Sequence, residues 1–105
     1  MNILFICSRN KWRSPTAEAI YKNRQEHKIK SAGTEPSAKI RVSPKDLIWA
    51  DTIFVMEKKH RQRIIDKFPY EIKDKKIVIL DIEDKYKYMD KELIEMIKLS
   101  VDPYL

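Results

Sequence analysis

Residues 3–17 read ILFICSRNKWRSPTA, a short apolar run followed by a polar loop and the start of a helix. The run Ile3–Ile6 is apolar at every position, as in strands that are covered on both faces of a parallel sheet. Pro15 suits the first position of a helix, and Ser14 before it is a suitable N-cap. This stretch therefore predicts a strand, a tight loop and a helix, which is the opening of an α/β fold.

The rest of the chain continues this alternation. Two more apolar runs, residues 53–56 and 77–80, predict buried strands, and the alternating residues 28–31 predict an edge strand. Helical periodicity with start signals such as Ser43-Pro44 and Asp90 predicts helices over residues 15–26, 44–50, 57–68 and 91–101. We expect one domain over residues 1–105: a doubly wound, four-stranded parallel sheet with helices on both faces and right-handed crossovers.

Composition narrows the class of protein. The 105 residues include 22 Lys and Arg against 16 Asp and Glu, a net charge of +6, and a single cysteine. One cysteine cannot form an internal disulfide, and no apolar run approaches the roughly 20 residues of a membrane span. The first residues lack the basic start and cleavage site of a signal peptide. We therefore expect a cytoplasmic protein with no membrane association, whose positive charge favours anionic partners.

The loop after the first strand carries groups suited to phosphate chemistry. Cys7 ends the strand and Arg13 follows six residues later, so the five residues between them can form a half-ring of inward-pointing backbone N–H groups. The positive potential of these N–H groups favours the thiolate form of the Cys7 sulfur. The planar fork of Arg13 can hold two phosphate oxygens, and Ser14 can donate to the sulfur. A lone cysteine after an apolar strand is more often a buried packing residue, but the strand-to-helix junction with Ser-Pro favours catalysis.

Residues 7–19, CSRNKWRSPTAEA, resemble the pattern C-x-x-N-x-x-R-S-P-x-A-E-A of the low-molecular-weight protein tyrosine phosphatase family. The segments 31–34 (SAGT) and 50–57 (ADTIFVME) agree with the same family, as does the acidic, tyrosine-rich loop before the last helix. The chain is shorter than usual members and resembles a compact branch. It departs from the family at Arg9, where glycine is usual, and at Trp12, where a second cysteine is common.

The resemblance implies a cysteine-dependent phosphomonoester hydrolase that acts as a protein tyrosine phosphatase through a phosphocysteine intermediate on Cys7. It implies no metal and no cofactor, a phosphorylated protein or small aryl phosphate as substrate, and binding of inorganic phosphate or other oxyanions at the loop. The loop residues expected to bind substrate are Ser8, Arg9, Asn10, Lys11, Trp12, Arg13 and Ser14. Asn10, Ser14 and Ser31 would hold the loop in shape, with Asn10 in a left-handed conformation.

The resemblance also implies a general acid and an aromatic pocket wall. We expect Asp84 to be the acid, because it follows a predicted strand and so emerges at the same sheet edge as Cys7. Asp102 in the Asp-Pro-Tyr triplet matches the letters of the family's acid loop but follows the last helix, and Asp81 is a further contender. Tyr86 and Tyr88 resemble the family's pocket wall, with solvent-edge packing as the alternative.

Two other functions compete with hydrolysis. A slow or inactive phosphate- or phosphoprotein-binding module could keep the anion loop despite the replacements at Arg9, Trp12 and Lys85. A nucleic-acid binder is not favoured, because the chain has net positive charge but no recognisable motif. His60 lies one turn before Ile64 in a predicted helix, and we expect it to pack there. No feature of the sequence points to a particular oligomeric state.

Overall fold

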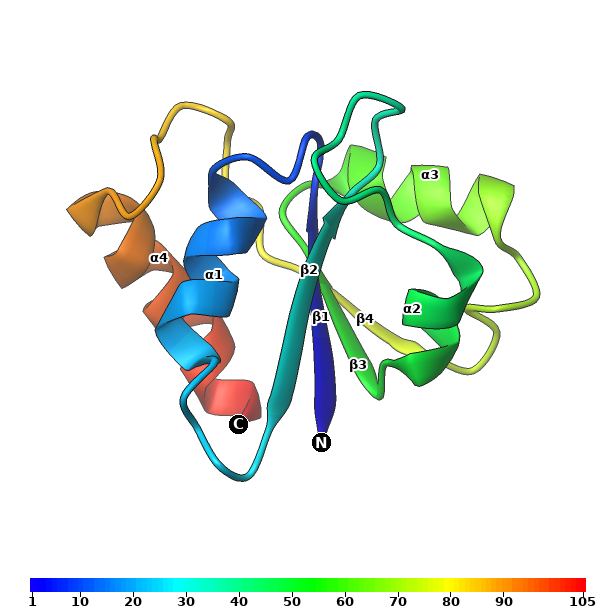
Figure 1. Cartoon of the computed structure of the whole chain (residues 1–105), viewed down its shortest axis with the longest axis horizontal. Helices are drawn as coiled ribbons and strands as arrows, with labels where there is room; N and C mark the ends of the chain where they lie inside the picture. Colours follow the sequence, from blue (N-terminus) through cyan, green and yellow to red (C-terminus); the bar gives the residue numbers. More distant parts are fainter.

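The protein is described here from a computed structural model that covers residues 1–105. Strands and helices alternate along the chain, which confirms the predicted order (Figure 1). The elements are β1 (Asn2–Cys7), α1 (Arg13–Tyr21), β2 (Lys28–Gly33), α2 (Pro44–Trp49), β3 (Thr52–Val55), α3 (Lys58–Lys67), β4 (Lys76–Ile79), α4 (Lys91–Val101) and a final 3-10 turn, Asp102–Tyr104.

The four strands form one parallel sheet in the order β2-β1-β3-β4. From β1 the chain moves outward to the edge strand β2, and then returns to build β3 and β4 on the other side. The direction of winding therefore reverses between β1 and β3. In open sheets of this kind, ligands bind at the carboxyl ends of the strands beside that reversal. The loops after β1, β2 and β4 all rise from this edge in Figure 1.

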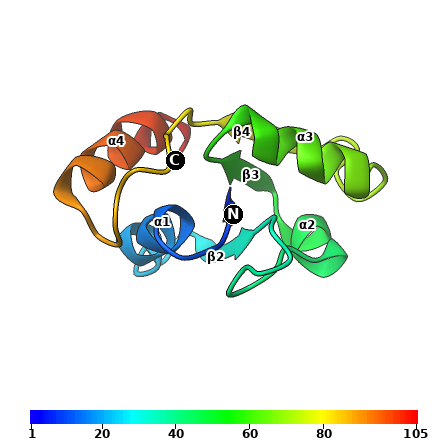
Figure 2. The same cartoon turned by 90° about the horizontal axis from the view of Figure 1, so that it is seen from above.

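Helices cover both faces of the sheet, as predicted. Helices α1 and α4 lie on one face, and α2 and α3 lie on the other (Figure 1 and, from above, Figure 2). Along β1, Ile3 and Phe5 belong to the core under α1 and α4, whereas Leu4 and Ile6 belong to the core under α2 and α3. All four are completely buried, which is why this strand is apolar at every position.

Helix starts follow the sequence signals in two cases and depart from them in one. The Ser43 hydroxyl accepts from the Asp46 N–H at the start of α2, and the Asp90 carboxylate caps α4. The prediction that Ser14 caps α1 is wrong. Helix α1 begins at Arg13, because the loop is already helical where the Thr16 N–H bonds the Trp12 carbonyl at 3.0 Å. Ser14 therefore lies in the first turn, and its hydroxyl serves the neighbouring cysteine instead.

Boundaries elsewhere shift by a few residues. Helix α1 ends at Tyr21 rather than continuing to residue 26, and β4 begins one residue before the predicted run. Neither shift affects the edge of the sheet that carries the loop after β1. None of the helices combines the length and apolar character that crossing a membrane requires.

Candidate active site

The loop between β1 and α1 is held in a ring by a buried asparagine. Asn10 is 1% exposed and has a φ of 54°, a left-handed conformation that asparagine adopts more readily than most residues. Its side-chain amide donates to Ser14 Oγ at 3.0 Å and to Ser31 Oγ at 2.9 Å. Ser31 in turn donates to the carboxylate of Glu18 on α1. The structure thus brings together the three side chains predicted to support the loop.

The cysteine sulfur lies at the floor of this ring. Cys7 is 3% exposed, and its Sγ lies 2.9 Å from Ser14 Oγ. Because Asn10 donates to Ser14 Oγ, the Ser14 proton is free for an acceptor of its own. It has two within reach: Cys7 Sγ and, at 3.3 Å, the Ala32 carbonyl oxygen. A thiolate at Cys7 would therefore receive a hydrogen bond from Ser14.

The guanidinium of Arg13 is buried and anchored on one side. Its Nη1 donates to Glu57 Oε2 at 2.7 Å and to the Ile82 carbonyl at 2.8 Å, which uses both of its N–H groups. Nη2 lies 3.5 Å from Ser8 Oγ, and Nε lies 3.6 Å from Asp84 Oδ1. These two contacts are long, so the Nε–Nη2 edge can exchange them for a bidentate contact with two oxygens of an anion.

Glu57 is a residue of this candidate site that the sequence reasoning missed. It follows β3 at the carboxyl edge, where its carboxylate reaches Arg13. Burial alone would raise the pKa of Glu57, but the hydrogen bond and charge of Arg13 outweigh it and hold the pKa below its ordinary value. A carboxylate just beyond a central strand, level with the Cys7 loop, was the available signal. Glu57 stays ionised and fixes the orientation of the arginine.

His60 does more than fill space in α3. It is fully buried, its Nδ1 accepts the Glu57 N–H at 3.0 Å, and its Nε2 therefore carries the proton and donates to Ser8 Oγ at 2.8 Å. Burial and then the charge of Arg13 lower the pKa of His60 to about 4. The ring is thus neutral near pH 7. The prediction that His60 packs in the helix is met, and the contact with the loop is an addition that periodicity alone cannot show.

One small cavity opens over the sulfur. Its volume is about 30 Å³, and its lining residues are Cys7, Arg9, Lys11, Trp12, Arg13 and Asp84. Asp84 reaches it from the exposed loop between β4 and α4. Asp102 lies near the opposite end of α1, where it accepts a hydrogen bond from Tyr21 at 2.6 Å. Asp81 does not line the cavity. Of the three aspartates considered from the sequence, Asp84 alone is at the sulfur.

The expectation for the two tyrosines needs correction. Tyr86 is 7% exposed and packs in the core under α1 and α4, because the loop after β4 turns inward to cover the end of that core. Tyr88 is exposed and lines a separate depression against α1, next to Pro15 and Lys22. The aromatic ring at the cavity is that of Trp12, with the Lys11 ammonium 4.8 Å from its centre.

A buried cysteine and a buried arginine that line one cavity at the carboxyl edge of a doubly wound sheet are the arrangement typical of cysteine-dependent phosphatases. Comparison with known proteins agrees with this assignment. Residues 2–46, which contain the whole loop, match the family model described as "Low molecular weight phosphotyrosine protein phosphatase". This match covers the strand, loop and helix that carry Cys7 and Arg13, and over these residues the chain is similar to that family. No curated protein sequence matches the chain.

Solved structures show the same fold over almost the whole chain. The YwlE arginine phosphatase from Geobacillus stearothermophilus is 24% identical, with a TM-score of 0.70 over 98% of this chain and 92% of that one. The tyrosine phosphatase Wzb from Escherichia coli K30, in complex with phosphate, is 20% identical, with a TM-score of 0.79 over 98% and 94%. The Streptococcus pyogenes enzyme SP-PTP is 16% identical, with a TM-score of 0.76 over 99% and 90%.

Proposed function

We propose that this protein hydrolyses phosphate monoesters, with phosphotyrosine in proteins as the substrate, through a phosphocysteine on Cys7. One observation carries the proposal. A nucleophilic sulfur, the free edge of a guanidinium and a carboxylate all line the same cavity, from Cys7, Arg13 and Asp84. The first can attack phosphorus, the second can hold two of its oxygens, and the third can protonate the leaving oxygen.

In the first step the Cys7 thiolate attacks phosphorus in line with the ester bond. A sulfur–phosphorus bond forms as the bond to the leaving oxygen breaks, and Asp84 gives that oxygen a proton. The Nε–Nη2 edge of Arg13 and the N–H groups of residues 8–13 stabilise the equatorial oxygens. Glu57 holds Arg13 from behind through Nη1, 2.7 Å away, so the fork does not have to be oriented during the reaction.

In the second step a water attacks the phosphocysteine. Asp84, now ionised, accepts a proton from that water as the sulfur–phosphorus bond breaks, and inorganic phosphate leaves. The departing sulfur regains its negative charge beside Ser14 Oγ, 2.9 Å away. The Ser14 proton can therefore point to the Ala32 carbonyl while the phosphocysteine exists and return to the sulfur when the thiolate is released.

Charges around the cavity favour an aryl ester over a phosphorylated guanidine. Arg9, Lys11 and Arg13 line it, and a guanidinium leaving group would bring a fourth positive charge beside them. A tyrosine ring is neutral and flat, and Trp12 offers it an indole face. We infer the cytoplasm as the place of action, because a single nucleophilic thiol works best where cellular reductants keep it reduced.

Hydrolysis of para-nitrophenyl phosphate without added metal tests the proposal, with a phosphotyrosine and a phosphoarginine peptide as further substrates. The wild type should turn over the aryl phosphate and favour the phosphotyrosine peptide, and vanadate should inhibit it. Cys7→Ser should lose at least about 10⁴-fold in kcat, as when other covalent nucleophiles are removed, yet still bind phosphate through the loop amides. Phosphate binding by a wild type that shows no turnover would identify the binding module instead.

A further inference from the structure

Three cations surround a second depression that adjoins the active-site cavity. It has a volume of about 400 Å³ and is lined by Arg9, Lys11, Ser37 and Lys39, all of them exposed. Arg9 and Lys11 line the active-site cavity as well, so the two hollows share one wall. The far wall comes from the loop between β2 and α2. These four residues form the basic shelf.

Backbone contacts fix the basic shelf against the Cys7 loop. The Lys39 N–H donates to the Arg9 carbonyl at 3.0 Å, and the Glu35 N–H donates to the Ser8 carbonyl at 2.8 Å. Gly33, the only glycine in the chain, permits this approach, because a Cβ there would lie 2.6 Å from the Ser8 carbonyl oxygen. The spacing between the shelf and the sulfur is therefore set by the fold.

The cations of the basic shelf make no ion pair within the protein. Arg9, Lys11 and Lys39 take part in none of the six ion pairs that lysine and arginine side chains form in the structure. The nearby carboxylate of Glu35 is paired with Arg63 at 2.7 Å. Asp84 lies in the active-site cavity beside Arg13 but does not line the shelf. A substrate thus meets a concentrated positive charge on one side of the sulfur.

We propose that the basic shelf binds acidic side chains next to the phosphorylated residue, so that the substrates are phosphoprotein segments with Asp or Glu beside the phosphotyrosine. This inference rests on the proposed function. A depression of this volume lies within the range that holds small ligand groups, and it shares the side chains of Arg9 and Lys11 with the cavity where the phosphoryl group is proposed to bind. Charges at such a rim attract a partner of opposite sign and act mainly on association, so the selectivity should fall with salt.

Peptides that differ only in their flanks test this inference. We would measure kcat/KM for one phosphotyrosine peptide flanked by glutamates, by glutamines or by lysines, with para-nitrophenyl phosphate as a substrate that cannot reach the shelf. At low ionic strength the glutamate peptide should exceed the glutamine peptide by about 10-fold, and 0.5 M salt should reduce this ratio to about 2-fold. The lysine peptide should be the poorest of the three.

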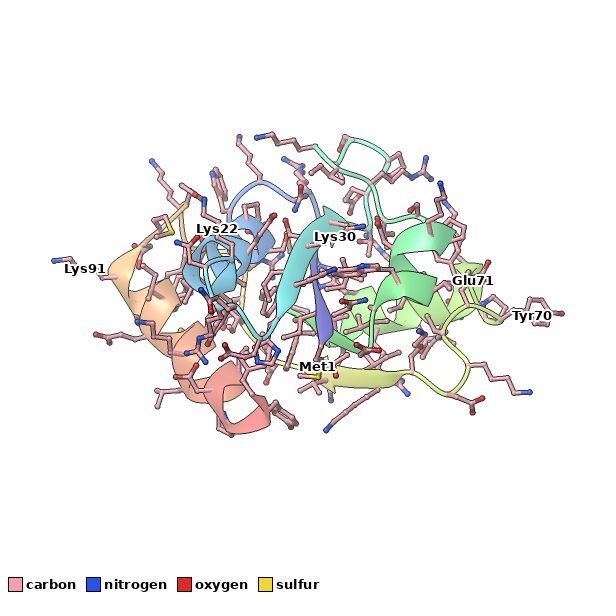
Figure 3. The ribbon with its side chains drawn as sticks, turned by 60° about the horizontal axis from the view of Figure 1, so that its bottom comes forward. Met1, Lys22, Lys30, Tyr70, Glu71 and Lys91 are labelled. Atoms are coloured by element: carbon pink, nitrogen blue, oxygen red, sulfur yellow. The ribbon has the colours of Figure 1, made fainter.

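The variant Lys39→Glu tests the shelf itself, because its side chain lies outside the machinery for phosphate. It should keep wild-type activity on para-nitrophenyl phosphate and lose the preference for glutamate. Lys73→Glu makes the same change of charge in the turn after α3 and should keep that preference. The neighbouring Tyr70 and Glu71 lie at the outer edge of the molecule (Figure 3), and Lys73 lines neither hollow.

The outcomes separate the two proposals. No turnover of para-nitrophenyl phosphate by the wild type would overturn the proposed function. Normal turnover of that compound with equal kcat/KM for the glutamate and glutamine peptides would overturn the shelf alone, as would a glutamate preference that survives in Lys39→Glu. An RNA oligonucleotide that competes better than a glutamate-rich peptide, and only when Lys39 is present, would also overturn the peptide assignment.

Discussion

The two ends of α1 each join this helix to the C-terminal half of the chain, but with different results. At its start, Arg13 bonds Glu57 and the Ile82 carbonyl and lies near Asp84, around a cavity with a sulfur at its floor. At its end, Tyr21 donates to Asp102 at 2.6 Å, and Arg24 lies 3.8 Å from the same carboxylate. At the start of α1, the Nε–Nη2 edge of Arg13 can still donate to a ligand, whereas at the end of α1 the polar groups are paired with one another.

This difference indicates why we choose the candidate general acid by its position relative to the sheet and not by the residue types next to it in the sequence. Asp102 precedes Pro-Tyr, as the acid of the family does, yet it sits beside the last turn of α1. Asp84 lacks the proline but follows β4 and so reaches the carboxyl edge. One end of α1 carries the proposed active site, and the other holds α1 and the C-terminal turn together.

Arg13→Lys gives the largest expected effect at the start of α1. A lysine ammonium cannot present the two parallel donors of the Nε–Nη2 edge while it also bonds Glu57 and the Ile82 carbonyl. We therefore expect kcat/KM to fall by about 10³-fold although the charge is conserved. Steady-state kinetics on para-nitrophenyl phosphate measures this. Arg24→Lys is the matched control at the other end and should stay within about 2-fold of wild type, since the pair it makes is exposed. Equal losses in both variants would remove the distinction between the two ends.

His60 should govern the acid side of the stability curve. Its pKa is lowered from an ordinary 6.5 to about 4, so the unfolded chain binds the proton first and stability falls as the pH drops between these values. The loss should amount to roughly 3 kcal/mol in the free energy of unfolding. Urea unfolding of wild type and His60→Gln at several pH values measures it, with His27→Gln as the control. Parallel curves for wild type and His60→Gln would contradict the buried, neutral ring.

Asp84→Asn should lower kcat by about 100-fold on phosphotyrosine peptides, whose leaving oxygen needs a proton. The loss should shrink on aryl phosphates with activated leaving groups. Asp102→Asn, at the other end of α1, should match wild type on both substrates. Should Asp102→Asn lose activity selectively while Asp84→Asn does not, the assignment of the acid would be reversed.

Tyr21→Phe should have the smallest effect and touch stability only. Removing the hydrogen bond to Asp102 should cost about 1 kcal/mol at neutral pH without changing kcat. Burial and then the hydrogen bond to Asp102 raise the pKa of Tyr21. The unfolded chain therefore loses its proton first, and stability falls as the pH rises beyond the ordinary tyrosine value, about 10. That alkaline loss should be weaker in Tyr21→Phe, whereas Tyr70→Phe, which alters an 88% exposed ring, should retain it.

Sequence patterns located all four strands, and Ile3–Ile6 is apolar throughout because β1 is buried on both faces. The prediction that residues 77–80 form a buried strand is wrong, because β4 lies at the edge of the sheet and is only half-buried. The loop could likewise be predicted, because Cys7, Asn10 and Arg13 lie within seven residues of one another in the sequence. The contacts of Glu57 with Arg13 and of His60 with Ser8 could not be predicted, because they depend on which strand ends lie side by side. Tyr86 was misjudged for a related reason: nothing local distinguishes a ring that lines a cavity from one that covers the core.

The Cys7 loop reaches its shape without a glycine. Asn10 is its one residue with positive φ, and Arg9 occupies the place where the family usually has glycine. A residue with a side chain explores fewer backbone states in the unfolded chain than glycine does, so less conformational entropy is lost when the loop forms. The folded conformation of the proposed anion site is therefore stabilised partly through the unfolded chain, which has fewer backbone conformations to lose.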